Sequence, residues 1–389
     1  MSAAQWRVDR LVDEIEVLGR LGLAREQYFR EVAGRLRRVI ASDATCWHTL
    51  DPETRMMTSD APHELIEQGV FTPESAPAAG ALIVASEYLR EDVNTFAALA
   101  GRRVPVGTLS DATRGHSERS ARYRDLLVPS GIPFELRAAF VSRGRCWGAV
   151  HIARRDDKRD FTHEDAAALA RVAGPIAEGI RTGVRFDAAR RPGDPTAPGL
   201  VVLGPSDDVE LITAPARELF SALRSSVLAE SDETPPTPLL ALASHVRSRA
   251  GETGGQTDVV AVPSSSGWIT LSASLPEGRR EGRVAIVLER SATQHATALR
   301  LEAHGVTPRE REVATLLAQG LSNTEIAAKL LLSPFTVQDH IKKLFEKTGV
   351  SSRQELVARV FLDDYLPQII RQTPLTAAGG FVHNEQTSA

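Results

Sequence analysis

The chain has 389 residues, of which 42% are hydrophobic and 25% charged, so its composition indicates a globular protein of two or three domains and excludes a disordered chain. Two cysteines exclude a disulfide scaffold, and no apolar run reaches the ~20 residues of a membrane helix. The charged N-terminus lacks a signal-peptide core, which predicts a cytoplasmic protein without a membrane partner.

The distribution of positive charge is more informative than the net charge of −4. Only five lysines occur, and four of them, Lys329, Lys342, Lys343 and Lys347, fall within nineteen residues. From Lys329 to Arg353 the net charge is +3. Such a segment is either a solvated helix face or a local patch that binds phosphate.

Catalytic motifs are absent from the sequence. No Gly-Lys-Ser/Thr loop for phosphate occurs, and the patterns H-E-x-x-H, paired C-x-x-C and G-x-S-x-G are also missing. We therefore predict no enzyme, no catalytic residues and no metal site, and the sequence names no cofactor.

Residues 1–186 predict a mixed α/β domain. Apolar residues at helical spacing open it, and residues 44–60 indicate two strands around an Asp-Pro turn. Residues 135–155 predict a hairpin that turns at 142–145, and Thr162 caps a long helix. From Leu136 to Ile180 this pattern resembles a GAF sensor domain, with its hairpin followed by a Phe-Thr-x-Glu-Asp helix start.

Residues 187–199, rich in Pro, Gly and Ala, predict a linker. Residues 200–292 then show the order β-β-α-α-β-β-β, which resembles a PAS domain; an unclassified α/β spacer is the alternative. The polar residues 367–389 predict a disordered tail.

Residues 300–366 carry the clearest helix signals. Capping boxes begin at Thr307, Ser322 and Ser352, and a Ser-Pro cap begins at Ser333. These caps predict four short helices in a compact all-α domain. The second and third helices are separated by only a few residues, which is typical of a helix-turn-helix.

The third helix of this region has two different faces. Val337, Ile341 and Leu344 recur at helical spacing and should pack inward. The opposite face is polar, with side chains that can bond to phosphates or to base edges. This is the construction expected of a recognition helix in the major groove of DNA.

The helices resemble the LuxR-type (GerE-like) helix-turn-helix family. The matching residues are Thr307, Pro308, Arg309, Glu310, Val313, Gly320, Ser322, Asn323, Glu325, Ile326, Ala327, Leu330, Ser333, Thr336, Val337, His340, Lys347, Gly349, Val350 and Arg353. The resemblance implies sequence-specific binding of double-stranded DNA, with family contacts carried over to Gln338, Asp339 and Lys342. Two residues depart from the family pattern: Phe335 stands where a basic or polar residue is common, and Asp339 puts a negative charge on the side that faces the groove.

Together, spacing and resemblance predict a set of DNA-binding residues on the second and third helices. They are Ser322, Asn323, Thr324, Ser333, Thr336, Gln338, Asp339, Lys342, Lys343 and Lys347. The family also pairs through the fourth helix, which implies a homodimer on a palindromic operator, with Val360, Phe361 and Tyr365 at the dimer face.

Two cysteines and two histidines lie on predicted strands. Cys46 and His48 share one strand face, and Cys146 and His151 lie in another strand. Their spacing fits no zinc pattern, so we expect buried structural cysteines. Trp47 and its counterparts Trp147 and Trp268 are expected in aromatic core packing.

The combined prediction is a transcriptional regulator whose GAF-like and PAS-like domains modulate a LuxR-type DNA-binding domain. A small-molecule effector and RNA polymerase are candidate partners. Control by a protein partner, and an enzyme that keeps a vestigial helix-turn-helix, are the alternatives.

Overall fold

The computed structural model describes most of the chain. The described residues are 3–61, 63–72, 75–187, 198–223, 234–249, 258–264, 267–276, 282–290, 301–318 and 321–357. They form two compact units: an N-terminal unit that ends at Arg290 and a C-terminal unit that starts at Leu301. Of the predicted linker, residues 188–197 lie outside the described residues, as does the whole predicted tail.

The first sheet of the N-terminal unit is antiparallel and has the strand order β2-β1-β5-β4-β3. Its strands are β1 (Ala44–Leu50), β2 (Met57–Ala61), β3 (Val106–Thr108), β4 (Phe134–Ser142) and β5 (Arg145–Arg154). Arg143 and Gly144 form the β4–β5 turn with φ of 52° and 75°, the left-handed geometry that matches the twist of a tight hairpin. The predicted hairpin is confirmed.

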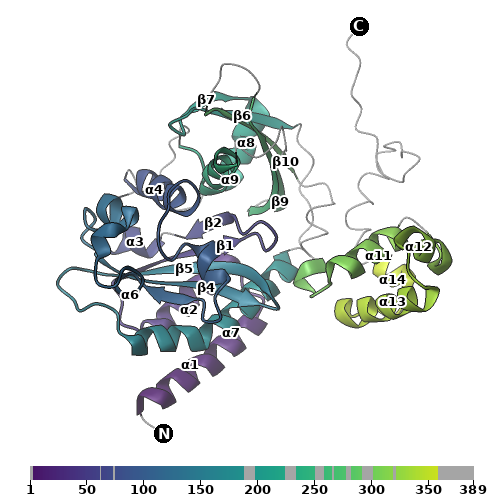
Figure 1. The fold of residues 1–389 in the computed structure, drawn as a ribbon, viewed down its shortest axis with the longest axis horizontal. Coiled ribbons are helices and arrows are strands. Elements are labelled where there is room, and N and C mark those ends of the chain that lie inside the picture. The colour runs from purple at the N-terminus through teal and green to yellow at the C-terminus, as the bar shows by residue number, and fades with distance from the viewer. Residues whose placement is uncertain are drawn as a thin grey trace. The chain divides into compact units, whose positions relative to one another are not determined.

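Helices cover both faces of this sheet (Figure 1). One face carries α1 (Ala3–Arg20), α2 (Arg25–Leu36) and α7 (His163–Asp187), and the other carries α3 (His63–Glu67), α4 (Ala76–Tyr88), α5 (Phe96–Ala100) and α6 (Leu109–Thr113). A short 3-10 turn, Ser117–Arg119, and a π-helical turn, Tyr123–Leu127, follow α6.

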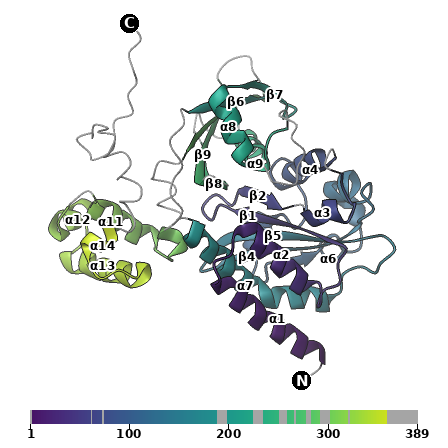
Figure 2. The same ribbon diagram turned by 180° about the vertical axis from the view of Figure 1, so that it is seen from behind.

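The long helices α1 and α7 lie alongside each other (Figures 1 and 2). The Thr162 hydroxyl accepts from the amide of Asp165 at 3.2 Å, which confirms the predicted cap of α7. Further along α7, the Tyr28 ring lies so close that a Cβ at Gly179 would be 2.0 Å from its hydroxyl. Only glycine permits this approach of α2 to α7.

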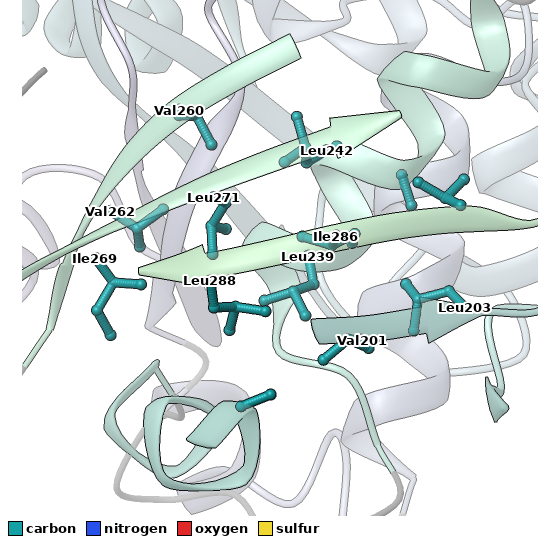
Figure 3. Packing of buried hydrophobic residues seen from close by; sticks show 14 of the residues in the cluster. Val201, Leu203, Leu239, Leu242, Val260, Val262, Ile269, Leu271, Ile286 and Leu288 are labelled. Atoms are coloured by element: carbon teal, nitrogen blue, oxygen red, sulfur yellow. The ribbon is translucent and has the colours of Figure 1, made fainter. Parts of the chain in front are cut away.

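The second sheet is also antiparallel, with the order β7-β6-β10-β9-β8. It comprises β6 (Gly199–Leu203), β7 (Val209–Ile212), β8 (Asp258–Ser264), β9 (Gly267–Ser274) and β10 (Val284–Arg290), with α8 (Ala214–Leu223) and α9 (Thr237–Ser248) between β7 and β8. This element order is the predicted one. Aliphatic side chains of the strands and of α9 fill its core (Figure 3).

The two sheets share a buried boundary through α9. Leu239 and Leu242 of this helix pack into the core of the second sheet, whereas Leu240 and Ala241 pack against residues of the first. Met56, which precedes β2, is buried in the second cluster. The two regions that the sequence separates into domains therefore form one compact unit.

The C-terminal unit consists of α11 (Pro308–Ala318), α12 (Asn323–Leu330), α13 (Pro334–Thr348) and α14 (Arg353–Val357). Their apolar faces enclose one core that includes Val313, Ile326 and Leu344. The fourth helix is described only to Val357, so the predicted dimer residues Val360, Phe361 and Tyr365 lie outside the described residues. In the described part of both units, no helix is long and apolar enough to cross a membrane.

Candidate nucleic-acid interface

Side-chain caps fix where the helices of the C-terminal unit begin. The Thr307 amide donates to Glu310 Oε2 at 2.8 Å, and the Glu310 amide donates to Thr307 Oγ1 at 3.3 Å. Ser322 forms the same reciprocal box with Glu325, and Ser333 Oγ accepts from the Thr336 amide at 3.0 Å. These three of the four predicted caps are confirmed. At the fourth, Ser352 Oγ accepts from the Glu355 amide at 3.1 Å, but the Glu355 carboxylate accepts from the amide of Ser351 instead of Ser352.

The turn between α12 and α13 is short, and large apolar side chains are exposed at it. Leu331 ends α12 in the left-handed conformation, with φ of 54°, a geometry that costs a branched side chain energy. Its side chain is 92% exposed, and Phe335, in the first turn of α13, is 85% exposed. Two large apolar groups therefore stand in solvent beside the start of α13.

The inner and outer faces of α13 are as predicted. Val337, Ile341 and Leu344 are buried in the domain core. After Pro334, the exposed side chains of α13 are Phe335, Gln338, Asp339, Lys342, Lys343 and Glu346. Thr336 is half-buried, while Ser322, Thr324 and Ser333 are exposed at the helix starts.

A hydrogen bond links α12 to the outer face of α13. Asn323 Nδ2 donates to Gln338 Oε1 at 2.6 Å. The two side chains were predicted separately, and the structure brings them together. The contact restrains the Gln338 amide, which reduces the conformational entropy that a base contact would cost.

Asp339 does not present an uncompensated negative charge. Lys343 Nζ lies 2.7 Å from Asp339 Oδ2, with both side chains about half exposed. The hydrogen bond from Lys343 lowers the pKa of Asp339 below its usual range. In the described part of the chain, Lys342 makes no ion pair, so its ammonium is the cation on this face that is available to a phosphate.

Lys347 has a structural partner. Its Nζ lies 2.6 Å from Oε2 of Glu310, whose side chain is only 4% exposed. Burial raises the pKa of Glu310, but the hydrogen bonds from Lys347 and Thr307 outweigh this effect and the pKa is lowered. The pair joins α13 to α11. A DNA contact from Lys347 stays a prediction.

Arg353 contributes a contact that its position in the sequence did not reveal. One guanidinium nitrogen donates to the carbonyls of Leu317 and Leu321, at 3.0 and 2.7 Å. It thereby satisfies acceptors at the end of α11. Arg309 does the same for α12, through a 2.6 Å bond to the Leu330 carbonyl.

The cysteines and two histidines of the N-terminal unit lie on neighbouring strands of the first sheet. Both cysteines are buried, as predicted, as are Trp47 and Trp147, while Trp268 is half-buried. Strand pairing also sets Cys46 opposite His151, with His48 two residues along β1. Within the described residues, no group of three or more His, Cys, Asp and Glu side chains could hold a metal ion.

Known proteins resemble the C-terminal unit. Residues 304–360 match the family described as bacterial regulatory proteins, luxR family. The transcriptional regulatory protein UhpA of Escherichia coli K12 is 55% identical over 56 residues, which are 14% of this chain and 29% of that protein. The response regulator Rre1 of Synechocystis is 53% identical over 51 residues, or 13% and 22% of the two chains.

The chain thus spans less than a third of the length of these relatives. Among solved structures, the Vibrio cholerae VqmA dimer, a LuxR-type receptor, is 20% identical, with 44% of this chain and 83% of that chain covered. Its TM-score of 0.20 is too low to carry an argument about the fold. The family match, together with the capped helices and the short turn between them, identifies a LuxR-type helix-turn-helix domain in the C-terminal unit.

Proposed function

We propose that the protein is a sequence-specific DNA-binding transcriptional regulator. The observation that carries the proposal is the coincidence of the LuxR-type match with an exposed, polar outer face on α13. One face of α13 packs against the core of the domain, and the opposite face is left free to contact a partner. Helices of this kind enter the major groove of duplex DNA.

The outer face offers distinct chemistry for bases and for the backbone. Gln338 can form paired hydrogen bonds with adenine, and Asp339 can accept from the cytosine amino group once Lys343 turns to a phosphate. Lys342 supplies a cation for phosphate or guanine. The exposed starts of α12 and α13, at Ser322 and Ser333, direct backbone N–H groups toward phosphates.

Phe335 supplies a third kind of contact. Its exposed ring at the first turn of α13 can pack against the 5-methyl group of thymine, which is an apolar feature of the major groove. This contact gives a reason for an aromatic residue where the family favours a basic or polar one.

A two-fold arrangement on a palindromic operator follows from the same proposal. Each domain makes few contacts, and pairing multiplies them across two half-sites. Val360, Phe361 and Tyr365 are the proposed dimer face. Sedimentation of the full chain on its DNA site tests this point, because one copy per palindrome would contradict it.

The N-terminal unit is proposed to be a GAF-like and PAS-like sensor region that modulates the DNA-binding domain. When the five strands of each sheet are numbered along the chain, both sheets have the spatial order 2-1-5-4-3, which supports their interpretation as two similar modules. Because α9 packs against both, a change at one sheet reaches the other. A small-molecule effector or a protein partner can supply that change.

The test is selection of bound fragments from a random duplex DNA library by the full-length protein. The affinity of the protein for the enriched fragments is then measured at a series of salt concentrations. We expect a shared palindromic site. Gln338→Ala should relax the preference at one position of each half-site, at a cost of about 1–3 kcal/mol there. Lys158→Ala, a lysine of the N-terminal unit that is 52% exposed, is the matched control.

The outcomes separate two explanations of failure. No enrichment with either the full chain or residues 300–366 alone would overturn the DNA-binding proposal. Enrichment by the isolated residues 300–366 but not by the full chain would instead show that the N-terminal unit prevents the domain from binding DNA, which is the modulation proposed here.

A further inference from the structure

The first helix of the N-terminal unit has an outer face that no other described element covers. α1 lies at the edge of this unit, alongside α7 (Figures 1 and 2). Leu11, Ile15 and Leu18 recur at helical spacing and are buried. On the opposite side, Trp6 is 52% exposed and Val17 is 59% exposed. Two large apolar side chains of one helix therefore stand in solvent.

Trp6 and Val17 belong to a straight stripe of four exposed residues. Residues 6, 10, 13 and 17 are all exposed and follow one another at intervals of four, three and four positions. With about 3.6 residues per turn, this spacing keeps them in a narrow band along one side of α1. The same alternation of intervals lines the seam between helices that pack along their whole length. The stripe therefore has the form of a helix-packing seam.

The stripe is complementary to its own reversed copy. Its two ends, Trp6 and Val17, are apolar, and its middle carries the oppositely charged Arg10 and Asp13. Consider two antiparallel copies of α1 related by a two-fold axis that passes between residues 11 and 12. Trp6 of one copy then meets Val17 of the other, and Arg10 of one meets Asp13 of the other. A parallel pair would instead set each charge against an identical one.

The side chains in the middle of the stripe can make this contact without leaving a charge uncompensated. Arg10 pairs with Glu14 of the same helix at 2.9 Å, and its side chain is 60% exposed. Glu14 has a second partner, Arg38, at 2.7 Å. Arg10 can therefore turn to Asp13 of another copy while Glu14 stays neutralised. The Arg10 guanidinium also lies over the Trp6 ring, 5.6 Å from its centroid, which orders both side chains on the stripe.

The residues beside the stripe are compatible with the antiparallel arrangement. On one flank, the reversed copy brings Arg7 toward Glu14, which is attractive. On the other flank, it brings Asp9 toward Glu16. Asp9 is already paired with Arg171 of α7 at 2.7 Å, so this approach does not join two uncompensated carboxylates.

We propose that the outer face of α1 is an interface at which two copies of this chain pair, with their α1 helices antiparallel. Trp6 and Val17 provide its apolar contacts. The two pairs of Arg10 with Asp13 fix its direction, as polar residues in a helix seam do at a cost in stability. Because the contact is limited to one helix, the association is weak. The interface lies outside the DNA-binding domain and does not rest on the proposed function.

Cysteine cross-linking of the full-length protein without DNA tests both the pairing and its direction. In an antiparallel pair, position 6 of one copy adjoins position 17 of the other, whereas two copies of the same position lie about 16 Å apart along the helices. A disulfide requires Cα atoms within roughly 7 Å. Under mild oxidation, an equimolar mixture of Trp6→Cys and Val17→Cys should therefore form a covalent dimer, and neither variant should do so alone.

Two controls measure the background of this assay. The wild type reports on the native cysteines, which are both buried. Val104→Cys replaces a side chain that is 54% exposed in the same unit but lies outside α1. Mixed with Trp6→Cys, it should give only the cross-linking that random collision produces.

Charge reversal in the same assay tests the central pairs. When both cysteine variants also carry Arg10→Asp, like charges face each other and the rate of cross-linking should fall about tenfold. When the Trp6→Cys copy carries Arg10→Asp and the Val17→Cys copy carries Asp13→Arg, an acidic helix faces a basic one and most of the rate should return. Such recovery between different copies cannot come from contacts within one helix.

A mixed dimer no more abundant than the Val104→Cys background would overturn the proposal. Disulfides within Trp6→Cys alone would show parallel pairing and overturn the antiparallel arrangement. Cysteines that neither cross-link nor react with a thiol reagent would show that another segment or partner covers the stripe, which also contradicts the proposal. None of these measurements involves DNA, so their failure would leave the DNA selection intact, and failure of the DNA selection would leave the cross-linking result intact.

Discussion

Oppositely charged side chains meet at almost the same distance in two very different places. Arg122 and Glu135 lie 2.8 Å apart with both side chains completely buried at the first sheet. Lys343 and Asp339 lie 2.7 Å apart on the outer face of α13, with about half of each side chain exposed. The first pair has only protein partners, among them Asp92 and Arg137, whereas the second can exchange its partner for a phosphate or a base.

The energetics of the two pairs differ for the same reason. Removing one member of a buried pair leaves an unpaired charge in a poorly polarisable surrounding, and the loss is large. An exposed pair is compensated by water and salt and contributes little. The buried charges should therefore control stability, and the exposed ones should control binding.

Replacement of the buried carboxylate should have the largest effect. Glu135→Gln leaves the guanidinium groups of Arg122 and Arg137 without their shared counter-charge and should lower the free energy of unfolding by about 3–5 kcal/mol. Denaturant unfolding of the full chain measures it. Asp339→Asn, the exposed counterpart, should leave the midpoint unchanged, and equal effects of the two variants would remove the distinction.

Acid should destabilise the buried cluster in two overlapping ranges of pH. Because the pKa values of His48 and His151 fall to about 3 and 4 in the folded state, the unfolded chain binds more protons below pH 6.5. Stability should fall from pH 6.5 toward pH 4, by roughly 1.4 kcal/mol per pH unit for each ring.

Glu135 affects the free energy of unfolding at lower pH than the histidines do. Burial raises its pKa, but Arg122 and Arg137 outweigh burial and lower it to about 2, so its contribution is lost only as pH falls from about 4.5 toward 2. Unfolding free energy measured between pH 7 and 5 isolates the histidines. His48→Phe should flatten that slope by about half and His163→Phe should not; an unchanged slope in His48→Phe would mean that the ring is not buried neutral.

The C-terminal unit could be predicted from sequence nearly residue by residue, because its signals are local. Each helix start depends on a cap within three residues, as at Ser322 and Ser333, and each inward stripe follows from helical spacing. The ion pair between Lys347 and Glu310 could not be predicted in this way. Glu310 lies 37 residues away, on a different helix.

The buried polar cluster of the first sheet escaped prediction because its parts are distant in sequence. Cys46 and His151 become neighbours only through the pairing of β1 with β5. From the sequence, Glu135 would be expected on the exposed face of a strand. In the structure it is buried, because Arg122 lies beside it and neutralises its charge. Likewise residues 238–243 of α9 are apolar on all sides of the helix, and the contact with the first sheet explains why.

Two lysines on α13 should separate binding from stability. Lys342→Ala should reduce the slope of log affinity against log salt by about one unit, because one phosphate contact is lost. Lys347→Ala should leave that slope unchanged and instead lower the unfolding midpoint of the domain, since it removes the partner of Glu310. A salt series on the selected operator measures the first and thermal unfolding the second; an equal loss of slope would show that Lys347 also reaches DNA.

The smallest predicted effect concerns the exposed apolar ring at the start of α13. If Phe335 packs on a thymine methyl group, replacing that thymine by deoxyuridine should weaken binding by about 0.8 kcal/mol, roughly fourfold, the contribution of one buried methyl or methylene group. Phe335→Ala should weaken binding to the thymine operator and abolish the difference between the two DNAs. Leu331→Ala, the other exposed apolar side chain, should preserve it. A deoxyuridine penalty that persists in Phe335→Ala would show that another group contacts the methyl. Such a result would show that Phe335, although exposed, is not among the residues that control DNA binding.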